Sequence, residues 1–93
     1  MHETLDLFWG RALKIARHYD TDQMTFADLA GLADDFAANF QETLGELGDE
    51  QRLQTTNHLQ QKLIKGSTDQ SHSQSVNEAL EELAASLSRI PIY

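Results

Sequence analysis

Apolar residues recur every three or four positions in four segments of this 93-residue chain, and this spacing constrains the fold most strongly. Such spacing places the apolar side chains on one face of a helix. It predicts helices over about 3–19, 26–47, 50–65 and 76–90, with an exposed polar loop at 67–74. Thirteen Leu and ten Ala, against four Ile and one Val, also favour helices over strands.

Each predicted helix has a single apolar stripe and would be unstable alone, so the four stripes are expected to face a common axis. Because the connections are short, successive helices should run antiparallel. We therefore predict an all-α fold, a single-domain antiparallel four-helix bundle over 1–93. Its core should contain the large side chains of Trp9, Phe26, Phe36, Phe40, Leu59 and Leu83.

Capping residues precede three of the predicted helices. Thr25 can cap the second helix, with Asp28 in the reciprocal position of a capping box. Asp49 is the expected cap of the third helix. Ser75 and Glu78 have the spacing of a complete capping box at the start of the fourth helix.

The chain is acidic, with 15 acidic and 7 basic residues and a formal net charge of −8. A surface of this sign repels nucleic acid, so no nucleic-acid partner is expected. No Lys or Arg lies between Arg17 and Arg52, and nine acidic residues do. This acidic 20–50 stretch is either a solubility surface or a face that attracts a basic protein partner.

Several classes of protein are excluded by the composition. The chain has no Cys and therefore no disulfide. Its longest apolar runs are two or three residues, so it is not expected to span a membrane. Residues 1–6 lack the basic and apolar regions of a signal peptide, and we expect a cytoplasmic protein.

The histidines show no metal-binding spacing, since His2, His18, His58 and His72 lie in different segments or at different ends of them. No nucleophile elbow, P-loop or glycine-rich dinucleotide motif is present. The apolar stripes also offer few inward polar groups. We therefore predict a protein that is not an enzyme and that uses no metal or cofactor.

Residues 62–67, Lys-Leu-Ile-Lys-Gly-Ser, resemble the His-x-x-Lys-Gly-Ser stretch of histidine phosphotransfer domains, which are also acidic four-helix bundles. Lys62 stands where that family has its phosphoaccepting histidine, and His58 lies one turn earlier. A degenerate phosphotransfer domain is therefore a remote alternative. Otherwise the stretch is an ordinary helix end, with Lys65 at the negative pole and Gly66 closing the helix.

As a whole, the chain resembles the small immunity proteins that protect lactic acid bacteria from pediocin-like bacteriocins, the enterocin A immunity family. The resemblance depends on chain length, on four helices without Cys, and on three segments. These are Phe26-Ala-Asp-Leu29, Lys62-Leu-Ile-Lys65 and the stretch from Glu82 to Ile90.

The resemblance implies a non-enzymatic cytosolic protein that gives self-protection by binding a mannose permease already engaged by the bacteriocin. In that family the C-terminal half determines which bacteriocin is resisted. The candidate partner-binding residues in that half are Lys62, Lys65, His72, Arg89, Ile90, Ile92 and Tyr93. The competing interpretation is a helical adaptor or regulatory module that binds through its acidic face. The oligomeric state, and whether the C-terminal tip folds back or is exposed, stay open.

Overall fold

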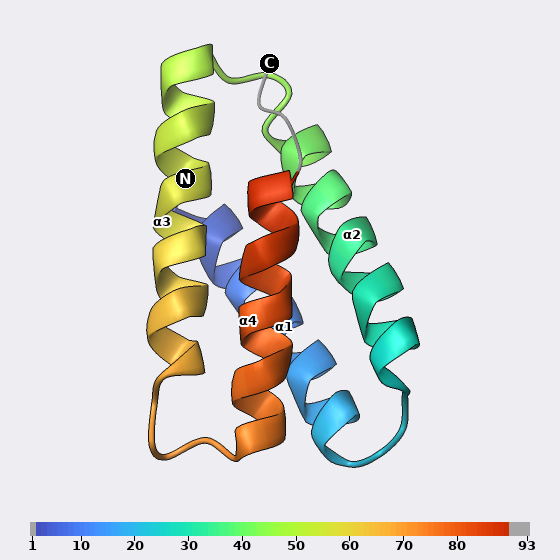
Figure 1. Ribbon diagram of the computed structural model, residues 1–93. Coiled ribbons are helices and arrows are strands. Elements are labelled where there is room, and N and C mark those ends of the chain that lie inside the picture. Colours follow the sequence, from blue (N-terminus) through green and yellow to red (C-terminus); the bar gives the residue numbers. More distant parts are fainter. Residues whose placement is uncertain (1, 90–93) are drawn as a thin grey trace.

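The computed structural model describes residues 2–89, with side chains described for residues 3–89. The order of elements is α1 (His2–Asp20), α2 (Phe26–Thr43), α3 (Asp49–Ser67) and α4 (Gln74–Arg89), and no strand occurs within that range. Successive helices run in opposite directions (Figure 1). The predicted all-α, antiparallel four-helix bundle is therefore confirmed.

The helix α4 packs against each of the other three helices. In Figure 1 it lies in front of α1, with α3 on one side and α2 on the other. Although α2 and α3 follow each other in the chain, they make few contacts. The helices α2 and α3 therefore lie on opposite sides of the packed α1–α4 pair, and the α1–α3 and α2–α4 interfaces are on different faces of the bundle.

The second helix ends at Thr43, four residues before the predicted end at 47. Gly45 lies two residues further on, after the C-cap residue Leu44, and glycine is a poor helix former because it loses more backbone freedom than any other residue. Turn hydrogen bonds from Gly45 N to Glu42 O and from Leu47 N to Leu44 O replace the helical pattern. Leu44 stays buried and Leu47 half-buried, so the apolar stripe continues beyond the helix.

The capping predictions are confirmed at one helix and wrong at two. Thr25 and Asp28 form the reciprocal capping box of α2. At α3 the N-cap is Gly48, which has no side chain to offer, and Asp49 is already the first helical residue. At α4 the hydroxyl of Ser73 accepts from Val76 N, so the capping residue lies two positions before the predicted cap Ser75 and the helix begins at Gln74.

The core lies along the axis of the bundle and centres on Phe8. Its ring meets those of Phe36 and Phe40 edge to face, at centroid distances of 5.5 and 4.9 Å. Such aromatic pairs stabilise by about 0.5–1.5 kcal/mol beyond their burial. The predicted burial of Phe36 and Phe40 is confirmed, and so is that of Leu59 and Leu83.

Two of the predicted core aromatics are placed differently. Phe26 is 55% exposed, and it lies beside Glu81, Glu82 and Ala85 of α4 at the surface rather than in the core. Trp9 is only half-buried and packs against the edge of the core. Phe8, its neighbour on α1, takes the central position instead.

Candidate protein-binding groove

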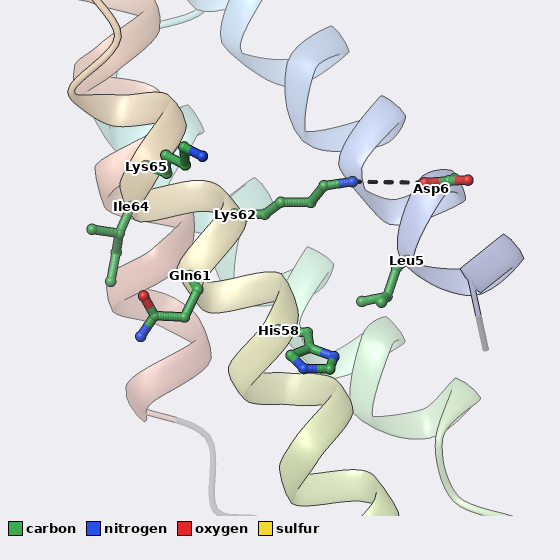
Figure 2. A pocket seen from close by; sticks show the side chains of 7 residues that line it. All are labelled: Leu5, Asp6, His58, Gln61, Lys62, Ile64 and Lys65. Atoms are coloured by element: carbon green, nitrogen blue, oxygen red, sulfur yellow. Dashed lines mark ion pairs between the residues drawn. The ribbon is translucent and has the colours of Figure 1, made fainter.

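A groove of about 590 Å³ runs between the N-terminal part of α1 and the C-terminal half of α3. We call it the α1–α3 groove. Figure 2 shows Lys62 reaching from α3 towards Asp6 on α1, with His58 and Leu5 together on one side of this bridge. Its lining residues are Leu5, Asp6, His58, Gln61, Lys62, Ile64 and Lys65.

The bridge across the groove is a surface ion pair. Lys62 Nζ lies 3.6 Å from Asp6 Oδ1 and 5.8 Å from the centroid of the Trp9 ring. The Lys62 and Asp6 side chains are 46% and 76% exposed, so water screens the pair and it contributes about 0–1 kcal/mol. An incoming partner can therefore displace Asp6 from Lys62 at little cost.

A second hollow of about 310 Å³ continues the groove towards the α3–α4 connection. The two share Lys62 and Lys65, which form the boundary between them. We call this second part the Trp9 hollow. Its lining residues are Trp9, Lys62, Lys65, Gly66, Asp69 and His72.

Gly66 allows Trp9 to lie where it does. It is buried, and a Cβ atom there would lie 2.7 Å from Trp9 Cη2 and 3.2 Å from Leu80 Cδ1. A real Cβ does not approach another atom as closely as 2.7 Å. The glycine therefore has a packing role here, besides its place near the end of α3.

The α3–α4 connection is held by local hydrogen bonds around Asp69. Its Oδ1 accepts from the Ser71 backbone N–H at 2.9 Å and from the Ser71 hydroxyl at 2.8 Å. These bonds favour the carboxylate form and lower the pKa of Asp69 from its ordinary value. His72 Nδ1 lies 3.0 Å from Gly66 O, which holds the imidazole at the rim of the Trp9 hollow.

The structure brings together three of the seven predicted partner-binding residues. Lys62, Lys65 and His72 all line the Trp9 hollow, and the two lysines also line the α1–α3 groove. Lys65 forms no ion pair with any residue from 3 to 89. Its charge is therefore available to a partner.

Arg89 does not line the groove. Its Nη2 lies 3.1 Å from Glu82 Oε1 and 3.2 Å from Asp34 Oδ1, on the α2–α4 side of the bundle. Hydrogen bonds to these carboxylates raise the pKa of Arg89. The other three predicted residues, Ile90, Ile92 and Tyr93, lie outside the described residues.

Sequence reasoning missed most of the groove walls. Trp9 was expected in the core. Helical spacing also groups Leu5 with the apolar stripe of the first helix and Ile64 with that of the third, although Ile64 is 45% exposed. Leu63 and Ile64 are adjacent on a helix and therefore point in different directions, so only one of them can face the core. The apolar pair at 63–64 was thus the available signal for a second apolar surface.

Most buried polar side chains are engaged within the fold. Gln41 Nε2 donates to Thr56 Oγ1 at 3.0 Å, which links α2 to α3. Thr55 donates to the Gln51 carbonyl at 2.8 Å. Ser86, which is fully buried, donates to Asp34 at 3.1 Å and accepts from Arg89 at 2.7 Å. The bonds of Gln41 and Ser86 tie helices together, whereas that of Thr55 stays within α3.

Comparison with protein-family models, curated proteins and solved structures finds no match to the chain. None of the described helices has the length and apolar content needed to cross a membrane. Residues 2–89 also contain no group of three or more His, Cys, Asp or Glu residues arranged to hold a metal ion.

Proposed function

We propose that this protein is a non-enzymatic binding module that docks a segment of a partner protein in the α1–α3 groove. In the setting that the sequence resemblance implies, it is a bacteriocin immunity protein. It acts inside the producer cell, and its partner is the mannose permease engaged by a pediocin-like bacteriocin. The observation that carries the proposal is the convergence of Lys62, Lys65 and His72 along a groove with apolar walls.

The chemistry of the groove indicates what it binds. Leu5 and Ile64 offer apolar surface, and an apolar side chain that covers them is removed from water. Lys62 and Lys65 add two positive charges, of which only the first has a partner within the described fold. The fitting occupant is an amphipathic segment in which a carboxylate lies next to an apolar side chain.

The position of the groove suits a selective contact. Its walls lie on two helices, which present side chains more rigidly than loops do. The Trp9 hollow extends it to the α3–α4 connection, in the C-terminal half to which the family resemblance assigns bacteriocin choice. The groove thus joins a rigid apolar part to a connection whose sequence can vary without disturbing the core.

Protection of a bacteriocin-sensitive strain tests the proposal. Cells that express the chain should survive a pediocin-like bacteriocin, and the Ile64→Lys variant should lose that protection because a charge then lies on the groove wall. Leu53→Lys is the matched control, since Leu53 is 49% exposed on the same helix and does not line the groove. If the wild-type chain does not reduce the killing of the sensitive cells by any pediocin-like bacteriocin, the immunity function is contradicted. Equal protection by both variants contradicts the assignment of the groove.

A further inference from the structure

The charges of this chain are separated across the bundle. The helices α1 and α3 together carry six basic and five acidic residues, whereas α2 and α4 carry one basic and seven acidic residues. The sequence shows the acidic excess but not this division, because it depends on which helices lie side by side. The negative potential of the molecule is therefore concentrated on the α2–α4 side.

An exposed aromatic residue lies on this acidic side. Phe26, at the start of α2, is 55% exposed, the largest exposed fraction among the large apolar side chains of residues 3–89. It lines two hollows, of about 530 and 260 Å³. We call the surface formed by both hollows the Phe26 face. Its lining residues are Tyr19, Asp22, Gln23, Met24, Thr25, Phe26, Asp28, Ser75, Glu78, Glu81, Glu82 and Ala85.

The Phe26 face has five carboxylates and no Lys or Arg in its lining. Three carboxylates are already engaged. Asp28 accepts from Thr25 N in the capping box, and Glu78 Oε1 accepts from Gln74 Nε2 at 3.4 Å. Glu82 lies 3.1 Å from Arg89. Asp22 and Glu81 form no ion pair with a residue of the described range. Both are exposed; Asp22 lines one hollow and Glu81 the other, and Phe26 lines both.

We infer that the Phe26 face binds a cationic segment of a partner protein, in which Lys or Arg residues flank an apolar side chain. The apolar side chain would cover Phe26, while the cations would meet Asp22 and Glu81. Charge complementarity selects this occupant, because nucleic acid would be repelled and a neutral apolar segment would leave the carboxylates facing it without counter-charge. This inference does not depend on the α1–α3 groove.

A second copy of the chain is a poorer occupant. Six of the seven basic residues lie on α1 and α3, where five acidic residues accompany them. Two copies would also bring together two molecules with a formal charge of −8 each. A separate cationic partner has neither disadvantage.

Binding of a designed peptide to the full chain tests this inference. The probe is a fluorescently labelled helical peptide of Lys, Leu and Ala, and fluorescence anisotropy gives its Kd. A peptide with Glu in place of Lys should show no binding. Affinity for the Lys peptide should fall by about tenfold when salt is raised from about 50 mM to about 500 mM, because the Debye length shortens.

Two pairs of variants separate docking at this face from attraction to net charge. Glu81→Lys and Asp35→Lys change the net charge equally, but Asp35 does not line the face. Phe26→Ala and Leu32→Ala each remove an exposed apolar side chain of α2, but Leu32 does not line it either. All four residues are exposed, so the fold should persist, and circular dichroism can check this.

The expected result is a loss of about tenfold in affinity for Glu81→Lys and for Phe26→Ala, with little change for their controls. Equal weakening by Glu81→Lys and Asp35→Lys would mean attraction to net charge only, and would overturn the assignment of this face. Equal peptide affinities of the Phe26→Ala variant and the wild-type chain would contradict the proposed contact with the Phe26 ring. Absence of millimolar or tighter binding by the Lys peptide would overturn the inference outright.

Discussion

Cη2 of Trp9 lies 2.7 Å from the position that a Cβ atom would take on Gly66. The indole therefore occupies space that any other residue at position 66 would fill. Since Trp9 is the only tryptophan and lines the hollow beside the α1–α3 groove, its fluorescence reports directly on this contact and on the groove. One relationship thus connects the packing of α1 on α3 to the candidate binding surface.

Replacing Gly66 with alanine should displace the indole. Overpacking of this kind costs about 1–3 kcal/mol, and the better helix propensity of alanine offsets about 1 kcal/mol of it. We expect a net loss of about 1 kcal/mol in the free energy of unfolding and a red shift of the Trp9 emission. Urea titration followed by fluorescence measures both.

Gly31→Ala is the matched control for this substitution. Gly31 is an exposed residue of α2, and a Cβ atom there would meet nothing within 4 Å. The free energy of unfolding of this control variant should rise by about 0.5–1 kcal/mol from helix propensity alone. If Gly66→Ala were as stable as Gly31→Ala with an unchanged Trp9 spectrum, the described contact would be wrong.

The aromatic core makes a second prediction. Phe8 is 1% exposed and meets two other rings, so Phe8→Ala should lose about 3–5 kcal/mol of stability. Phe26→Ala should change it by less than about 0.5 kcal/mol, because its ring is mostly in water. Chemical denaturation followed by circular dichroism compares the two. Similar losses for both variants would place Phe26 back in the core.

The contrast between Phe8 and Phe26 shows how far the sequence predicts the fold. Helical spacing predicts four helices around a shared core, because each apolar stripe has to be buried, and the short connections predict their antiparallel order. It does not decide which residue at the edge of a stripe reaches the centre. Phe26 is the first residue of α2 and lies at the surface beside α4, and periodicity carries no information about how far the end of a stripe is covered.

Ser86 makes a third prediction, since it is a fully buried hydroxyl between α4 and α2. Ser86→Ala removes the hydrogen bond that Ser86 donates to Asp34 and the one that it accepts from Arg89. It should lower the free energy of unfolding by about 1–2 kcal/mol. Ser75→Ala is the control, because Ser75 lies on the same helix and no hydrogen bond of its side chain is found within residues 3–89. Thermal unfolding should separate the two variants. Equal melting temperatures would show that the Ser86 network contributes nothing.

Asp69 makes a prediction about pH. Its pKa in the folded chain is lowered from 3.8 by the hydrogen bonds from Ser71, so the unfolded chain binds the proton more readily. The stabilisation is present above pH 3.8 and is lost as the pH falls through the folded pKa. NMR titration of the Asp69 carboxyl carbon should give a midpoint below pH 3.8. The Ser71 amide should exchange faster once the Asp69 carboxyl group is protonated. A midpoint at or above 3.8 would contradict these bonds.

The candidate site could be predicted only in part. Lys62 and Lys65 lie one turn apart on a helix, so their common face follows from spacing alone. Leu5 and Trp9 join them only because α1 packs beside α3, and no local pattern in the chain specifies that pairing. The sequence groups Arg89 with the two lysines because all three lie in the C-terminal half of the chain. In the fold, α4 carries Arg89 to the α2–α4 side.

The central claim is that the α1–α3 groove contacts the partner, and NMR spectroscopy of the labelled chain tests it most directly. The chain would be titrated with detergent-solubilised mannose permease, with and without a pediocin-like bacteriocin. Backbone signals of Leu5, His58, Ile64 and Lys65 should broaden first when both components are present, while Leu53 and Leu32 keep their intensity. Uniform broadening, or selective broadening on α2 with an unchanged groove, would contradict the account.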